Sequence, residues 1–161
     1  MLLLVVEDRH AERPLRDALA SAARSGTGVA VLTADALLAM QLRREGVDAR
    51  LTTDGLARAE VDARDRLALD GVAAAYGDGP RRHMSALGTD FGACLEYTLI
   101  PSFVRAVRNV TAVTDALNAA PPPDSLVLAG GGALVAAARL VTRQRGVRTT
   151  SVAGDPVRRA L

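Results

Sequence analysis

A glycine-rich turn between two apolar runs constrains the fold of this chain more than any other stretch. The run Ser125–Ala129 has the length of a buried strand, and three consecutive glycines follow it at positions 130–132. Glycine has no Cβ atom, so the backbone can turn sharply there and a ligand or another segment can approach closely. A helical pattern over Ala133–Arg145 and the run Val147–Val152 complete a strand–helix–strand unit. A unit this short predicts a right-handed crossover between parallel strands.

The first fifty residues show the same alternation. The expected strands there are Leu2–Val6, Val29–Leu32 and Val47–Leu51. The first of them is continuously apolar, as is typical of a central strand buried on both faces. A helix that starts near Pro14 follows it, and the helix Ala34–Glu45 follows the second strand, with Thr33 or Asp35 as its N-cap.

A long, mostly helical connection separates the third strand from the fourth. The stretch Asp54–Tyr76 is helix-compatible and densely charged, with opposite charges four residues apart. Residues 77–89 are rich in loop-forming residues, and a second helical pattern runs over Phe91–Ala119. Because Pro101 interrupts this pattern, we expect a kink or two helices near Ile100.

These elements predict a single α/β domain over residues 1–161 with a helical crossover at about 54–120. The expected architecture is a Rossmann-like, doubly wound parallel sheet of about five strands in the order 3-2-1-4-5, with helices on both faces. Ligands of such sheets bind in the crevice outside the carboxyl ends of the strands, where the strand order reverses. The expected crevice therefore lies between the loops that follow the first and fourth strands.

Composition narrows the functional classes. All 20 basic residues are arginine, and they are interspersed with 18 acidic residues, so no surface for nucleic acid is expected. The single Cys94 cannot form an internal disulfide or a thiolate metal site, and the two histidines lie far apart in sequence, so we expect no metal. We infer a reducing, cytoplasmic compartment. No apolar run approaches the roughly 20 residues that span a bilayer.

The loop after the first strand carries the most suggestive polar residues: Glu7, Asp8, Arg9 and His10. His10 is a candidate general base for an acceptor hydroxyl, with Glu7 or Asp8 orienting its ring. Arg9 is a candidate ligand contact. The alternative is a solvated turn in which Asp8 caps the following helix.

The glycine turn admits three interpretations. The pattern Gly130, Gly131, Gly132 followed by Asp155 has the outline of a dinucleotide-binding fingerprint. However, Val135 stands where the third glycine of that fingerprint belongs. The other interpretations are a simple tight turn and a site for some other anion at the helix N-terminus.

Two further groups are candidates for ligand contacts. Arg81 and His83 lie in the expected loop and either bind a phosphate or carboxylate or are simply solvated. An apolar stripe from Tyr97 through Phe103 to Val107 either contacts a lipid-linked acceptor or a membrane surface, or is the inward face of a helix.

Four segments of the chain resemble the N-terminal lobe of GT-B glycosyltransferases of the surface-polysaccharide type. The family's first strand, its loop and a helix directed at the acceptor pocket are similar to the segment LLLVVEDRHAERPLRDALA of this chain. The family's second strand, the helix after it and its third strand are similar to the segment VLTADALLAMQLRREGVDARL. The long helical region and fourth strand resemble EYTLIPSFVRAVRNVTAVTDALNAAPPPDSLVLAGGG, and the last crossover resembles GALVAAARLVTRQRGVRTTSVAGD.

The resemblance implies an acceptor-binding domain that is not catalytic alone. A sugar or lipid-linked acceptor would contact Glu7, Asp8 and His10, and His10 would correspond to a catalytic histidine of this loop. The glycines would let the ligand or a second lobe approach. The nucleotide-sugar donor would be held by a C-terminal lobe or a partner protein, and no cofactor is assigned to this domain itself.

Two alternatives stay open. The first is a small nucleotide- or dinucleotide-binding module that acts with a partner protein. The second is a non-catalytic assembly domain, with a homo-oligomer among its forms, that uses the charged stretch Asp54–Tyr76 or the apolar stripe as an interface.

Overall fold

The computed structural model of the chain describes residues 1–76, 85–86 and 89–152, with side chains described for residues 1–74 and 99–152. The chain divides into two compact units, which we describe separately. One consists of Met1–Asp54 with Asn109–Leu161, and the other is Gly55–Arg108.

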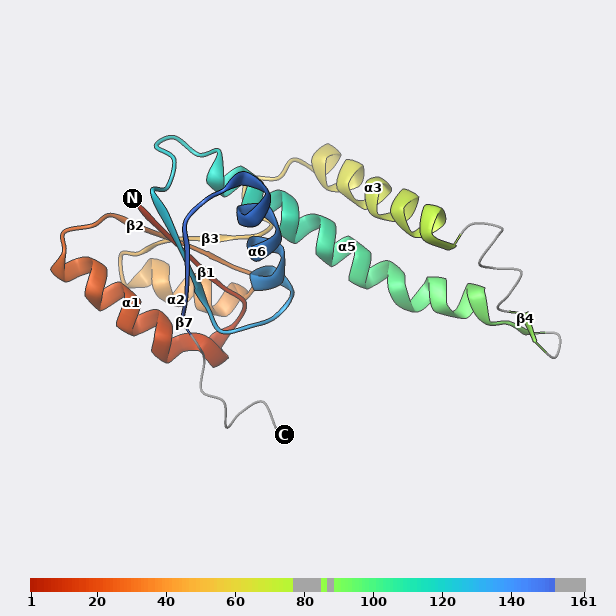
Figure 1. The fold of residues 1–161 in the computed structure, drawn as a ribbon, viewed down its shortest axis with the longest axis horizontal. Coiled ribbons are helices and arrows are strands. Elements are labelled where there is room, and N and C mark those ends of the chain that lie inside the picture. The colour runs from red at the N-terminus through yellow and green to blue at the C-terminus, as the bar shows by residue number, and fades with distance from the viewer. Residues whose placement is uncertain (77–84, 87–88, 153–161) are drawn as a thin grey trace. The chain divides into compact units, whose positions relative to one another are not determined.

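The first unit contains a five-stranded sheet in the order β3-β2-β1-β6-β7 (Figure 1). The strands are β1 (Leu2–Val6), β2 (Val29–Thr33), β3 (Asp48–Leu51), β6 (Ser125–Ala129) and β7 (Thr149–Val152). Every neighbouring pair is parallel, and Leu4 of the central strand is in register with Val31 on one side and Val127 on the other. The predicted fold class and strand order are therefore confirmed.

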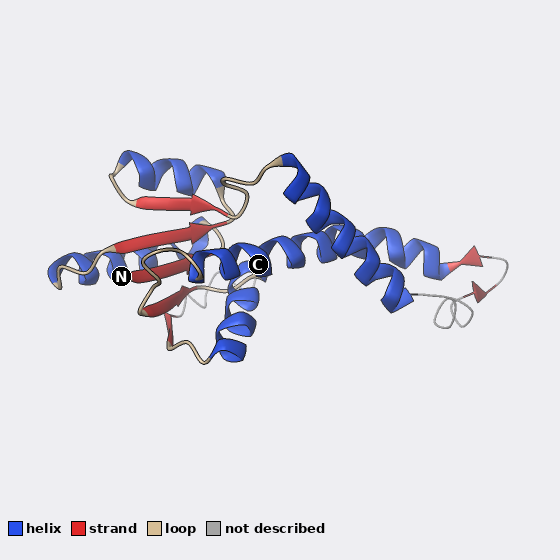
Figure 2. Cartoon of the chain, turned by 90° about the horizontal axis from the view of Figure 1, so that it is seen from above, coloured by secondary structure: helices blue, strands red, loops and turns tan. Residues whose placement is uncertain are grey.

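Helices cover both faces of this sheet (Figure 2). They are α1 (Glu12–Arg24), α2 (Ala36–Arg44), α6 (Ala133–Arg145) and the last part of α5 (Phe91–Leu117). On one face, Leu15 of α1 and Leu38 of α2 pack with Val31. On the other, Val113 of α5 and Val135 of α6 pack with Val5.

This arrangement fixes the position of the crevice. The connection after β1 runs over one face of the sheet, whereas the connection after β6 runs over the opposite face. Since β1 and β6 are neighbours, the two connections diverge at the carboxyl ends of these strands. The loops that follow Val6 and Ala129 therefore meet there.

The second unit is built on α3 (Arg58–Tyr76) and the first part of α5, with a short antiparallel ladder of β4 (Ser85–Ala86) and β5 (Thr89–Asp90). The guanidinium of Arg108 holds the carboxylate of Asp65 through hydrogen bonds of 2.8–3.1 Å and so joins α5 to α3. A Cβ atom on Gly71 would lie 3.6 Å from the ring of Phe103. Phe103, from the apolar stripe, therefore packs against α3.

Of the two alternatives expected near Ile100, that of two separate helices is wrong, because α5 continues through Pro101 as one helix. Proline removes one backbone donor from a helix, which a long helix with intact turns on both sides can tolerate. Pro101 itself is exposed. Within the described residues, no helix is both long and apolar enough to cross a bilayer.

Candidate functional site

The carboxylate of Glu7 lies at the N-terminus of α6. Glu7 follows the last residue of β1, and its Oε2 atom accepts a hydrogen bond from the backbone N–H of Leu134. Leu134 is in the first turn of α6, where backbone N–H groups have no acceptor within the helix. A negative charge is also favoured there by the helix dipole. The anion position at this helix is thus filled by a carboxylate of the chain itself.

The glycine turn allows this contact. Gly130 and Gly132 have φ angles of +78° and +112°, in the region that favours glycine. A Cβ atom on Gly132 would lie 2.8 Å from both Cγ and Cδ of Glu7, and one on Gly130 would lie 2.9 Å from Cβ of Ala11. Gly131 is exposed between them. These glycines therefore let the loop after β6 pack directly against the loop after β1.

Asp8 and His10 form the turn that begins α1. The Oδ1 atom of Asp8 accepts a 2.8 Å hydrogen bond from the backbone N–H of His10 and caps the 3-10 turn η1 (Arg9–Ala11). Asp8 thus caps the 3-10 turn that precedes α1, whereas Ala11, at the N-cap position of α1 itself, makes no side-chain capping bond. His10 is exposed, and in the described part of the chain no hydrogen bond engages its imidazole. Its ring is therefore accessible at the carboxyl edge of the sheet.

Arg9 is held by Asp35, a residue that the sequence indicates only as a possible helix cap. The carboxylate of Asp35 accepts hydrogen bonds from the N–H groups of Leu37 (2.9 Å) and Leu38 (3.1 Å) and pairs with Nε of Arg9 at 3.2 Å. Partial burial opposes ionisation of Asp35, but the two N–H groups and the guanidinium outweigh it and lower its pKa. The pairing with Arg9 depends on the path of the two loops that follow the neighbouring strands β1 and β2, which local residue patterns do not show.

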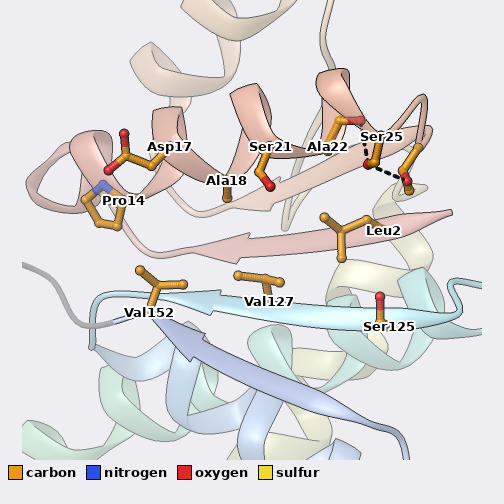
Figure 3. A pocket seen from close by; sticks show the side chains of 11 residues that line it. Leu2, Pro14, Asp17, Ala18, Ser21, Ala22, Ser25, Ser125, Val127 and Val152 are labelled. Carbon is orange, nitrogen blue, oxygen red and sulfur yellow. Dashed lines mark hydrogen bonds between the residues drawn. The ribbon is translucent and has the colours of Figure 1, made fainter.

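An open groove of about 450 Å³ lies on the α1 side of the sheet (Figure 3). Its apolar wall is formed by residues of α1 and of the strands β1, β6 and β7: Leu2, Pro14, Ala18, Ala22, Val127 and Val152. Asp17 and Ser21, one helical turn apart on α1, add a carboxylate and a hydroxyl. Sequence reasoning missed this groove. The available signal was the run of small and polar residues on one flank of α1.

Three of the predicted site residues, Arg81, His83 and Asp155, lie outside the described residues. The side chain of Tyr97 does too. The structure brings Glu7, Asp8, His10 and the glycine turn to one edge of the sheet. Within the described ranges, no three His, Cys, Asp or Glu side chains are arranged to hold a metal ion.

Comparison with known proteins adds no relative. The chain matches no protein-family model, and neither the curated proteins nor the solved structures give a match. The residues at the edge of the sheet and in the groove are therefore the basis for a functional proposal.

Proposed function

We propose that this chain is the acceptor-binding domain of a GT-B-like glycosyltransferase. In this proposal it binds a neutral, hydroxyl-bearing acceptor at the carboxyl edge of the sheet and leaves the nucleotide-sugar donor to another lobe. The observation that carries the proposal is the carboxylate of Glu7 at the N-terminus of α6.

Glu7 distinguishes a neutral ligand from an anionic one. Doubly wound domains that bind nucleotides place a phosphate group at such a helix N-terminus, where free N–H groups point outward. Here Glu7 already accepts the hydrogen bond from Leu134 and would repel a phosphate placed beside it. A sugar hydroxyl carries no charge and can donate a hydrogen bond to a carboxylate. The position of the Glu7 carboxylate therefore favours a neutral sugar acceptor over a dinucleotide as the ligand of this edge.

In this proposal, His10 is the general base that deprotonates the acceptor. Glycosyl transfer requires the attacking hydroxyl of the acceptor to lose a proton, and an imidazole can take it. The exposed ring of His10 lies on the turn that Asp8 holds through the backbone. Asp8 therefore positions the loop in this scheme. The donor sugar and its nucleotide come from the second lobe.

The groove beside α1 suits the apolar portion of a lipid-linked acceptor. It reaches Pro14, in the first turn of α1, and Val152, at the end of β7, so it extends to the carboxyl side of the sheet. Its aliphatic wall would bury an alkyl chain, and each buried methylene group adds about 0.8 kcal/mol to binding. An acceptor with a sugar head and an apolar tail can thus use both features.

Thermal shift measurements with matched ligands test this proposal. Alkyl glycosides should raise the melting temperature of the chain, and longer alkyl chains should raise it more, whereas NAD and UDP-sugars should not. Ala18→Leu fills part of the groove and should weaken the response to alkyl chain length. Ala20→Leu, the same change on an exposed position of α1, is the control.

Stabilisation by NAD or UDP-sugars but not by glycosides would overturn the proposal in favour of the nucleotide-binding module. An equal loss of response in Ala18→Leu and Ala20→Leu would remove the groove from it.

A further inference from the structure

We propose that the exposed face of α3 is a self-association surface, on which a second copy of this chain docks with its own α3 antiparallel. This inference concerns the second unit alone and does not depend on the proposed glycosyltransferase role. It rests on the order of charges along the helix and on the shape of the face that carries them.

The face in question is the one that α3 turns away from α5. Asp65 and Gly71 contact α5, and Ala68 and Val72 are buried on the same side. The opposite side holds a groove of about 490 Å³, lined by Ala59, Asp62, Ala63, Arg66, Leu67 and Asp70. All six residues are exposed, and Leu67 is 62% exposed.

Charges alternate along this face at intervals of four residues. Arg58, Asp62, Arg66 and Asp70 follow one another in a row that winds gradually around the helix, because residues four apart lie nearly on the same side. The last three of them line the groove. In the part of the chain that the structure describes, none of the four forms an ion pair. The row is thus available to a partner.

The order of these charges is self-complementary. When two copies of α3 pack antiparallel, cross so that their rows of charges align, and share a twofold axis beside position 64, Arg58 faces Asp70 of the second copy. Asp62 then faces Arg66 of the second copy. Symmetry repeats each pair, so four ion pairs form. A parallel arrangement in register would instead place each charge beside an identical one, so the charge order selects the antiparallel dimer.

The small residues between the charges allow the two helices to approach. Ala59 and Ala63 leave room on each helix, and the aliphatic stem of Arg66 and the side chain of Leu67 can cover that space from the opposite copy. Because exposed ion pairs are individually weak, we expect a reversible dimer that dissociates at high salt.

Charge-reversal variants of the full chain test this pairing by sedimentation velocity at low and high salt. Asp62→Arg and Arg66→Asp each place like charges together in the homodimer, so each should weaken dimerisation by about tenfold or more. An equimolar mixture of the two single variants should dimerise again, because one variant is basic at both positions 62 and 66 and the other is acidic at both. The double variant should also recover a homodimer, since its two charges are exchanged.

The mixture is the decisive experiment, since each single variant also places like charges four residues apart within its own helix. Mixing the two proteins cannot remove that repulsion within each helix, so recovery must come from contact between copies. Circular dichroism spectra matching the native chain would show that the exposed substitutions leave α3 folded. A wild-type chain that stays monomeric at about 1 mM, single variants that dimerise like wild type, or a mixture that stays monomeric would each overturn the proposal.

Discussion

The carboxylate of Glu7 accepts a hydrogen bond from the backbone N–H of Leu134, which lies 127 positions later in the chain. The contact joins the end of the central strand to the first turn of the helix on the opposite side of the switch point. It therefore has two consequences, one for stability and one for the charge of any ligand that this edge can accept.

Removing this contact should destabilise the first unit. Glu7→Ala leaves the N–H of Leu134 without its acceptor and should lower the free energy of unfolding by about 1–2 kcal/mol. Glu7→Gln keeps an oxygen acceptor but loses the charge, so its loss should be smaller. Urea unfolding of the two variants measures both values. Wild-type stability in Glu7→Ala would mean that the hydrogen bond contributes nothing.

Gly132 should tolerate no side chain while Glu7 is in place. Gly132→Ala should cost about 1–3 kcal/mol for its backbone conformation, with a further cost from the contact with Glu7. Gly26→Ala is a matched control, because Gly26 also has a positive φ angle but a Cβ atom there meets nothing within 4 Å.

The double variant Glu7→Ala/Gly132→Ala separates the two contributions. With the Glu7 side chain truncated, the cost of alanine at 132 should fall to that of its backbone conformation alone, about 1–3 kcal/mol. A cost for Gly132→Ala that is the same in both backgrounds would show that the two residues do not interact.

Asp35 should make the stability depend on acid pH. Its pKa in the folded chain is below the ordinary value of 3.8. The stabilisation that ionised Asp35 gives to the folded chain is therefore fully present above its ordinary pKa. It is lost as the pH falls through the lower pKa of the folded chain. Asp35→Ala should cost about 1–2 kcal/mol at neutral pH, where the ionised carboxylate caps α2.

Urea unfolding of wild type and Asp35→Ala across the acid range measures this dependence. The difference between the two proteins should be constant near neutrality and shrink below about pH 4. A difference that grows on acidification would contradict the sign of the pKa shift.

The fold of the sheet could be read from the sequence because its strands are continuous apolar runs. The runs Leu2–Val6 and Ser125–Ala129 form strands with the predicted bounds. The two strands at the edges of the sheet are shorter than predicted: β3 begins at Asp48 rather than at Val47, and β7 begins at Thr149 rather than at Val147. Edge strands are less buried, so apolar patterning marks their ends less sharply.

The contacts of the site could not be read from the sequence in the same way. Patterning placed Glu7 at the edge of the sheet, but its contact with Leu134 depends on the path of the turn at Gly130 and Gly132. The pairing of Arg9 with Asp35 depends likewise on the loops that follow two neighbouring strands. Such contacts arise from tertiary geometry, which local residue patterns do not encode.

Arg108→Lys should loosen the second unit without changing its charge. Lysine cannot reproduce the two-pronged contact that Arg108 makes with Asp65. Because both side chains are about one-third exposed, the loss should be small, about 0.5–1 kcal/mol. Amide hydrogen exchange should accelerate in α3 and remain unchanged in the β1 and β2 amides. Unchanged exchange in α3 would mean that the pair does not hold the helices.

The most direct test of the proposed acceptor site follows the backbone amides of residues 7–11 and 130–134 by NMR during ligand titration. Alkyl glycosides should shift these amides in a saturable way, while NAD, UDP and inorganic phosphate should leave them unchanged, because Glu7 fills the anion position of α6. Saturable shifts at these amides from NAD, UDP or phosphate, with none from any glycoside, would contradict the account.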